Sequence, residues 1–96
     1  MELLIVYDVA TTSTTGQKRL RRVAKACEGY GQRVQYSVFE CTLSELQFEQ
    51  LRTRLNGIIN SEEDSLRIYR LMQPRERCIE VLGRPLSHDL HDPLVL

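Results

Sequence analysis

The feature that most constrains this chain is a run of five apolar residues near its start, Leu3 to Tyr7, which ends directly at Asp8. The run is too short for a helix, and β-branched and aromatic residues help to fill it, so it predicts a buried strand. A buried strand needs other strands beside it and a layer packed over it. With only 96 residues, the chain predicts one small domain with a thin core, to which a partner subunit would add buried surface.

Two amphipathic helices and three further strands are predicted after this run. A capping box of Thr14 and Gln17 predicts the start of the first helix, and Gly29 its end. A second capping box, Thr42 with Glu45, predicts the start of the second helix. Alternating or short apolar patterns predict strands over residues 33–41, 65–72 and 78–82.

This order of elements predicts an α+β fold of the ferredoxin-like, split βαβ sandwich type. Such sheets stay open on one face or at their edges, and association of two sheets is the usual remedy, so we expect a homodimer. We predict a domain over residues 1–82 and a C-terminal tail over residues 83–96. The apolar end of that tail, residues 94–96, is suited to adding a strand to a neighbouring sheet edge.

The sequence predicts a cytoplasmic protein with no place in a membrane. No apolar run approaches the ~20 residues that a membrane-spanning helix needs. The first residues have neither the basic start nor the cleavage site of a signal peptide. Cys27, Cys41 and Cys78 are odd in number, widely spaced and set among apolar residues. We therefore interpret them as small buried hydrophobic residues rather than disulfide partners or zinc ligands.

Asp8 is the first candidate functional residue, because it places a carboxylate at the end of a buried strand. One interpretation is structural: the side chain caps the following loop through backbone amides. The other is a magnesium ligand, although a hard cation needs several oxygens and one Asp supplies too few. A two-fold axis would bring a second Asp8, and a divalent cation between the two carboxylates would remove their repulsion.

The second candidate is the first predicted helix, which is strongly basic although the whole chain has a net charge of zero. Five of eight consecutive positions on this helix are basic and have no acidic partner four residues on: Lys18, Arg19, Arg21, Arg22 and Lys25. A solvated helix face usually mixes charges of both signs. A contact with phosphate groups is therefore as reasonable an interpretation as a solvated face.

The third candidate is the predicted strand over residues 33–41. Arg33, Gln35 and Ser37 alternate along it, so they would share one face as hydrogen-bond donors to phosphate or to another subunit. Tyr36 and Phe39 are expected in the core rather than as platforms on which bases stack. The segment from His88 to Asp92 resembles a metal-binding box only in composition, and we expect a solvated tail there. The sequence contains no Gly-rich phosphate loop or dinucleotide fingerprint.

Two segments carry a specific resemblance to a known family. The residues from Val6 to Val9 and the run from Gly31 to Glu40, GQRVQYSVFE, resemble the smaller of the two universal CRISPR adaptation proteins, the CRISPR-associated endoribonuclease family. The resemblance implies a βαββαβ ferredoxin-like fold and a homodimer joined through its sheets. It also implies a C-terminal strand exchanged between subunits, and two consecutive strands where the pattern alone predicts one.

The resemblance also implies roles for individual residues. The metal-binding and catalytic aspartate of the family corresponds to Asp8, which lies beside Tyr7. The nucleic-acid-binding residues of the family correspond to Lys18, Arg19, Arg22, Arg33 and Ser37. The supporting residue of the second motif corresponds to Phe39.

Two functions follow from this resemblance. One is a phosphodiesterase for RNA or DNA, with Mg²⁺ shared by Asp8 of both subunits. The other, which we favour physiologically, is a dimeric scaffold that holds new DNA for the adaptation integrase while the integrase does the chemistry. An RNA-binding or regulatory domain on the same fold is a distant third interpretation. The acidic segment from Glu62 to Asp64 is a candidate surface for the integrase.

Overall fold

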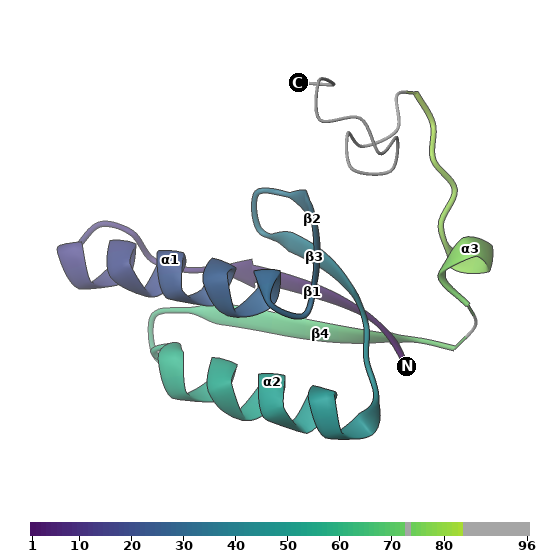
Figure 1. Cartoon of the computed structure of the whole chain (residues 1–96). Coiled ribbons are helices and arrows are strands. Elements are labelled where there is room, and N and C mark those ends of the chain that lie inside the picture. The colour runs from purple at the N-terminus through teal and green to yellow at the C-terminus, as the bar shows by residue number, and fades with distance from the viewer. Residues whose placement is uncertain (73, 84–96) are drawn as a thin grey trace.

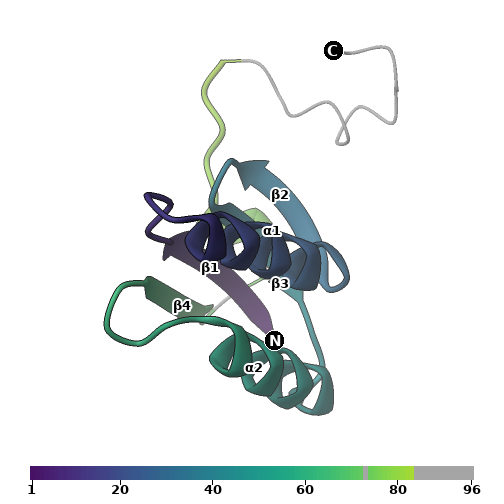
Figure 2. The same cartoon turned by 90° about the vertical axis from the view of Figure 1, so that its left-hand side faces the viewer.

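The computed structural model describes residues 1–72 and 74–83. They form a four-stranded antiparallel sheet with two long helices packed on one face (Figures 1 and 2). In chain order the elements are β1 (Glu2–Asp8), α1 (Thr14–Glu28), β2 (Gly31–Gln35), β3 (Val38–Thr42), α2 (Glu45–Ile58), β4 (Ser65–Leu71) and the short helix α3 (Arg75–Cys78).

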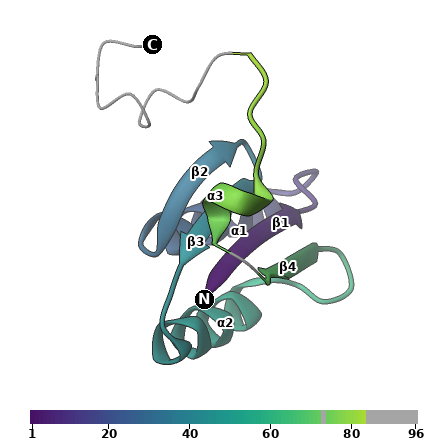
Figure 3. The same ribbon diagram turned by 90° about the vertical axis from the view of Figure 1, so that its right-hand side faces the viewer.

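The sheet has the strand order β2-β3-β1-β4, which Figure 3 shows from one end of the molecule. With the element order βαββαβ, this is the ferredoxin-like topology, so the predicted fold class is confirmed. β1 is central and pairs with β3 on one side and with β4 on the other. Residues at the end of β1 therefore lie beside the start of both neighbouring strands.

The core lies between the sheet and the two helices. Leu3, Ile5 and Tyr7 of β1 alternate toward the helices, as the apolar run predicts, and Leu51 and Leu55 of α2 pack against them. The first helix adds buried residues that include Val23, Ala26 and Cys27.

Cys27 and Cys41 are buried, which confirms the prediction for these two, whereas Cys78 is exposed and the prediction is wrong there. Burial raises the pKa of Cys27 to about 12 and that of Cys41 to about 11. Both thiols are therefore protonated at neutral pH and are poor nucleophiles.

Both helices begin at a different cap from the one predicted. Ser13, not Thr14, caps α1, and its hydroxyl accepts a hydrogen bond from the amide of Gly16 at 3.0 Å. Ser44, not Thr42, caps α2 in a reciprocal capping box with Gln47. Several Ser and Thr residues precede each helix, and the cap is the one whose backbone is extended at the point where the chain turns.

The single strand predicted over residues 33–41 is instead a hairpin of β2 and β3. Its turn at Tyr36 and Ser37 contains no Gly, Pro, Asn or Asp, and Ser37 alone is a weak turn signal, so the turn is not evident from the sequence. The turn carbonyls are satisfied from β1: the amide of Tyr7 donates to Ser37 at 3.1 Å, and the Tyr7 hydroxyl donates to Tyr36 at 3.3 Å. This hairpin confirms the split into two strands that the family resemblance implies.

The strand predicted over residues 78–82 is also wrong. Pro74 precedes one helical turn, α3, in which the amide of Arg77 donates to the Pro74 carbonyl at 2.9 Å. Residues 79–83 have no regular structure, and the segment after β4 leads away from the sheet (Figure 1). The tail from 84 onward, with its predicted strand and the segment from His88 to Asp92, lies outside the described residues, so those predictions and the boundary at 82/83 stay predictions.

Replacing Gly31 with Ala should destabilise the fold, whereas Gly57→Ala should stabilise it. A methyl group at position 31 would overlap with the Glu40 carbonyl oxygen and the Cys41 sulfur, but position 57 on α2 is open. We expect a loss of about 1–3 kcal/mol for Gly31→Ala and a gain of about 0.5–1 kcal/mol for Gly57→Ala. Urea unfolding measures both changes, and equal stability of the two variants would contradict the packing described for β2.

Candidate nucleic-acid and metal site

Asp8 is exposed at the end of β1, beside Ser65 at the start of β4. Because Tyr7 points into the core, the alternation of the strand places Asp8 on the face opposite the helices. Its carboxylate makes no hydrogen bond or ion pair with any described residue. The loop-capping interpretation of Asp8 is therefore wrong, and the side chain is available to a ligand.

Asp64, rather than Asp8, caps the loop after β1. Its carboxylate accepts hydrogen bonds from the amides of Ala10 at 3.1 Å and Asn60 at 2.8 Å. Arg19 of α1 donates to the same carboxylate through Nε at 2.9 Å. The Asp64 side chain is fully buried and that of Arg19 is 14% exposed. This cluster joins the loop after β1, the first helix and the connection before β4.

Burial raises the pKa of the Asp64 carboxyl, but the hydrogen bonds from Arg19, Asn60 and Ala10 outweigh burial and the net pKa is lowered. Asp64 is therefore ionised at neutral pH. It is not part of an acidic surface, so the predicted integrase surface from Glu62 to Asp64 is wrong for this residue. Glu63 also lies 3.6 Å from Arg19.

The basic residues of α1 fall into two groups. Arg19 is held by the carboxylates of the chain itself, which gives it a structural role that the basic pattern does not indicate. The others are exposed and make no ion pair with any described residue: Lys18, Arg21, Arg22 and Lys25. Phosphate contact by Lys18 and Arg22 stays a prediction, and for Arg19 it would compete with Asp64.

Two aromatic residues, Tyr7 and Phe39, pack beneath the hairpin. Phe39 is fully buried, its ring is stacked on that of Tyr7 with centroids 6.2 Å apart, and the Arg33 guanidinium lies 5.2 Å from its centre. Burial raises the pKa of Tyr7, so its hydroxyl stays protonated and donates to the hairpin. Arg33 also faces Glu28 at 3.6 Å. Tyr7 and Phe39 thus support the hairpin from inside.

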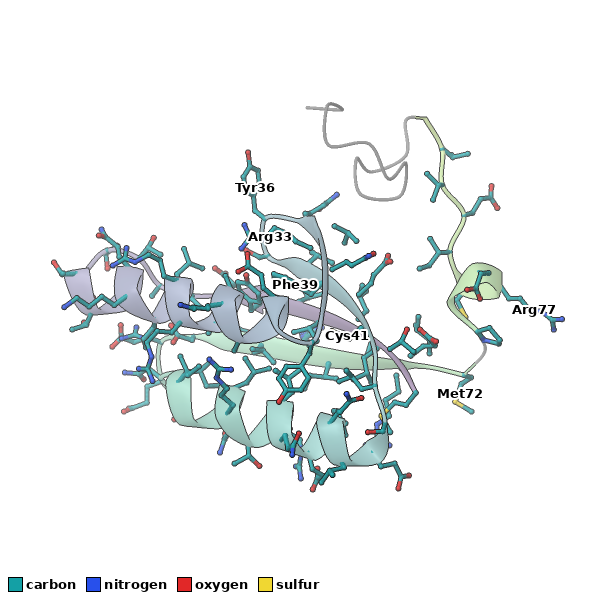
Figure 4. All side chains as sticks on the ribbon, viewed as in Figure 1. Arg33, Tyr36, Phe39, Cys41, Met72 and Arg77 are labelled. Atoms are coloured by element: carbon teal, nitrogen blue, oxygen red, sulfur yellow. The ribbon has the colours of Figure 1, made fainter. Side chains whose placement is uncertain are left out.

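Tyr36 is the clearest departure from the sequence prediction at this site. It was expected in the core, but it is 91% exposed and points away from the domain at the hairpin tip (Figure 4). Ser37 lies in the turn, so it does not share a strand face with Arg33 and Gln35 as predicted. The alternation that predicted both positions ends where the chain turns.

The fold brings Asp8 and the hairpin tip to the same end of the sheet, since β1 ends where the hairpin turns and β4 begins. A concavity of about 240 Å³ lies between α1 and the hairpin and includes Tyr7, Arg21, Arg33, Tyr36 and Ser37. Another, of about 780 Å³, runs along the hairpin from Arg33 to Val38. The described residues contain no cluster of three or more His, Cys, Asp or Glu that could hold a metal ion.

The sequence model of the family described as CRISPR associated protein Cas2 matches residues 1–78. The chain belongs to the Cas2 family. It is 53% identical over its full length to the whole of the CRISPR-associated endoribonuclease Cas2 1 of Moorella thermoacetica. It is also 53% identical, over 99% of both chains, to the CRISPR-associated endonuclease Cas2 of Halalkalibacterium halodurans.

The fold agrees with a solved Cas2 structure. The crystal structure of Streptococcus pyogenes Cas2 at pH 6.5 superposes with a TM-score of 0.76 at 48% sequence identity, over 86% of this chain and 100% of that one. The family resemblance expected from the two motifs is therefore confirmed. Among the described residues, no helix of this Cas2 family member is both long and apolar enough to cross a membrane.

Arg19→Gln should unfold much more easily than Arg22→Gln. Removing Arg19 leaves the Asp64 carboxylate, whose side chain is covered, without its cation, so we expect a clear loss of stability. Arg22 is exposed on the same helix, so its replacement should change the free energy of unfolding by no more than about 0.5 kcal/mol. Denaturant unfolding of both variants measures this difference. Similar stabilities would mean that the ion pair with Asp64 contributes little.

The contribution of Asp64 to stability should disappear in acid. Its folded pKa lies below its ordinary value of 3.8, so the contribution is complete above that value and is lost as the pH falls through the folded pKa. Asp64→Asn should be less stable than wild type at neutral pH, and the difference in thermal midpoint should shrink below about pH 4. A difference that stays constant down to about pH 2 would contradict an ionised Asp64.

Proposed function

We propose that this Cas2 family member is a dimeric CRISPR adaptation subunit that binds nucleic acid as a scaffold for the integrase and also has Mg²⁺-dependent endonuclease activity. The observation that carries the proposal is an exposed, unpartnered Asp8 at the same end of the sheet as Arg33 and Ser37. Relatives of the chain are named endoribonucleases and an endonuclease, so we propose phosphodiester cleavage of RNA or DNA. The compartment that fits is the cytoplasm.

The dimer is proposed from the open face of the sheet. Leu4 and Val6 of β1 alternate onto this face, beside Val38 of β3 and Tyr69 of β4, which is 44% exposed. The two long helices cover only the other face. A two-fold axis through the open face would cover these apolar side chains and bring a second Asp8 nearby. We further propose that the tail from residue 83 onward pairs with the partner subunit.

Magnesium fits the donor set only in such a dimer. The Asp8 carboxylate is a hard oxygen ligand that pairs with no described residue, but the described residues contain no group of three or more His, Cys, Asp or Glu that could complete the coordination of an ion. Two copies of Asp8 would hold one ion between them. When bound, the ion would orient water and stabilise the charge that develops on the phosphate.

Basic and polar residues of α1 and the hairpin would bind the nucleic-acid backbone. Lys18, Arg22 and Arg33 offer positive charge to phosphate oxygens, and the Ser37 hydroxyl can donate a hydrogen bond. Arg19 is the exception, since its guanidinium is occupied by Asp64. Contacts of this kind hold RNA or DNA without reading its sequence.

A scaffold without physiological nuclease activity is the second candidate function. It is favoured by the same geometry, because the described residues contain no group of three or more His, Cys, Asp or Glu that could hold a metal ion and supply a general base at Asp8. The integrase would then carry out the chemistry, and this dimer would hold the DNA between integrase subunits.

Asp8→Asn should abolish Mg²⁺-dependent cleavage while leaving the dimer intact, because the substitution removes the charge and little volume. Labelled RNA and DNA would be incubated with Mg²⁺, and spacer acquisition would be measured with the cognate integrase. Light scattering would follow the dimer. Glu45→Gln, at an exposed carboxylate on α2 outside the site, is the matched control and should cleave as wild type does.

The two functions separate in this comparison. Loss of both cleavage and acquisition in Asp8→Asn would make the chemistry part of the biological role. Acquisition that persists without cleavage would identify the scaffold as the main function. Cleavage by Asp8→Asn at the wild-type rate, or a wild-type protein that is monomeric, would remove the proposed metal site.

A further inference from the structure

Tyr36 presents an aromatic ring to solvent from a rigid base. The ring is 91% exposed at the hairpin tip and points away from the domain (Figure 4). The backbone beneath it is fixed by Tyr7, whose hydroxyl donates to the Tyr36 carbonyl and whose amide donates to Ser37. Binding through this ring would cost little conformational entropy, because the turn is already ordered and the side chain has only two rotatable bonds.

Two arginines lie near the hairpin tip that carries Tyr36. Tyr36 and Arg33 line both concavities at this end of the sheet, and Arg21 of α1 lines the smaller one. Among the described residues, no Asp or Glu lines either concavity, and the acid paired with Arg33 is Glu28, 3.6 Å away on the α1 side. The local charge is therefore suited to an anion, while the ring is suited to a flat apolar partner.

A nucleotide with an unpaired base combines these two properties. Its base has an exposed π-face that can stack on a tyrosine, and its phosphate can reach a neighbouring guanidinium. A base pair inside a duplex has both faces already stacked on its neighbours, so it offers nothing to the ring. The arginines alone would serve either kind of strand, since both carry phosphates.

We propose that Tyr36, together with Arg21 and Arg33, binds an unpaired nucleotide of single-stranded RNA or DNA. The base stacks on the Tyr36 ring, and the adjoining phosphate lies toward the two arginines. This site rests on the proposed nucleic-acid-binding function and adds a preference for single strands at the end of the sheet that carries Asp8.

Binding of a fluorescently labelled oligothymidylate, measured by anisotropy beside a duplex of equal length, tests the site. Tyr36→Ala should weaken single-strand binding by about 5- to 150-fold, the loss expected for one stacked base. It should leave duplex binding and the salt dependence of binding unchanged. Arg33→Gln should instead lower the salt slope on single strands by about 0.7. Leu46→Ala removes another exposed apolar side chain, on α2, and should bind as wild type does.

Tyrosine fluorescence provides an independent readout, because the chain has four Tyr and no Trp. Stacking on a base quenches a tyrosine, so oligothymidylate should quench part of the wild-type emission. Tyr36→Phe keeps an aromatic ring and should keep the affinity, but it should lose that part of the quenching. Retained affinity without this quenching would support a base on the ring.

Three outcomes would overturn this site. Tyr36→Ala could bind oligothymidylate as tightly as wild type, it could weaken single-strand and duplex binding equally, or it could dissociate the dimer and so identify the ring as a subunit contact. If wild type binds duplex and Tyr36→Ala binds single strands as tightly as wild type does, only this inference is rejected. A wild-type protein that binds neither strand form at low salt would reject the proposed function as well.

Discussion

The central position of β1 determines the arrangement of the whole candidate site. β1 pairs along its length with β4 and over five residue pairs with β3, so the place where it ends fixes where both neighbours begin. Asp8 is the last residue of this strand. The hairpin tip, the Asp64 cluster and the start of α1 are all attached to the same end, and their relative positions follow from the register of one strand.

Two kinds of contact hold that end of the sheet together. On one side Tyr7 uses its amide, its ring and its hydroxyl to hold the hairpin, largely through burial of aromatic surface. On the other side a buried carboxylate, Asp64, holds two backbone amides and Arg19. Breaking the ion pair of Asp64 with Arg19 is costly because the buried carboxylate would lose its partner. Asp8 lies between the two kinds of contact with its own side chain unconstrained, an arrangement suited to a ligand rather than to a structural role.

The same geometry explains why a single chain is an incomplete nuclease site. A hard cation needs more oxygens than one carboxylate offers, and the described part of the chain contains no group of three or more His, Cys, Asp or Glu that could hold a metal ion. Although the net charge is zero, the basic residues have two different roles. Arg19 pairs with Asp64 inside the fold, whereas Lys18, Arg21 and Arg22 are exposed on α1 and Arg33 lines the concavities at the hairpin.

The sequence by itself determined what depends on local pattern. The apolar run of β1, the buried face of α2, the fold class and the family all follow from periodicity and two short motifs, and Asp8 was identified from its place after the run. Only the tertiary structure decided the turn at Tyr36 and Ser37, the exposure of the Tyr36 ring and the pairing of Arg19 with Asp64. The turn and the ion pair depend on partners 29 and 45 residues apart in the chain. No local pattern indicates such partners, because a turn held by a distant strand needs no turn residues, and a buried ion pair forms only where the packed elements bring the two charges together.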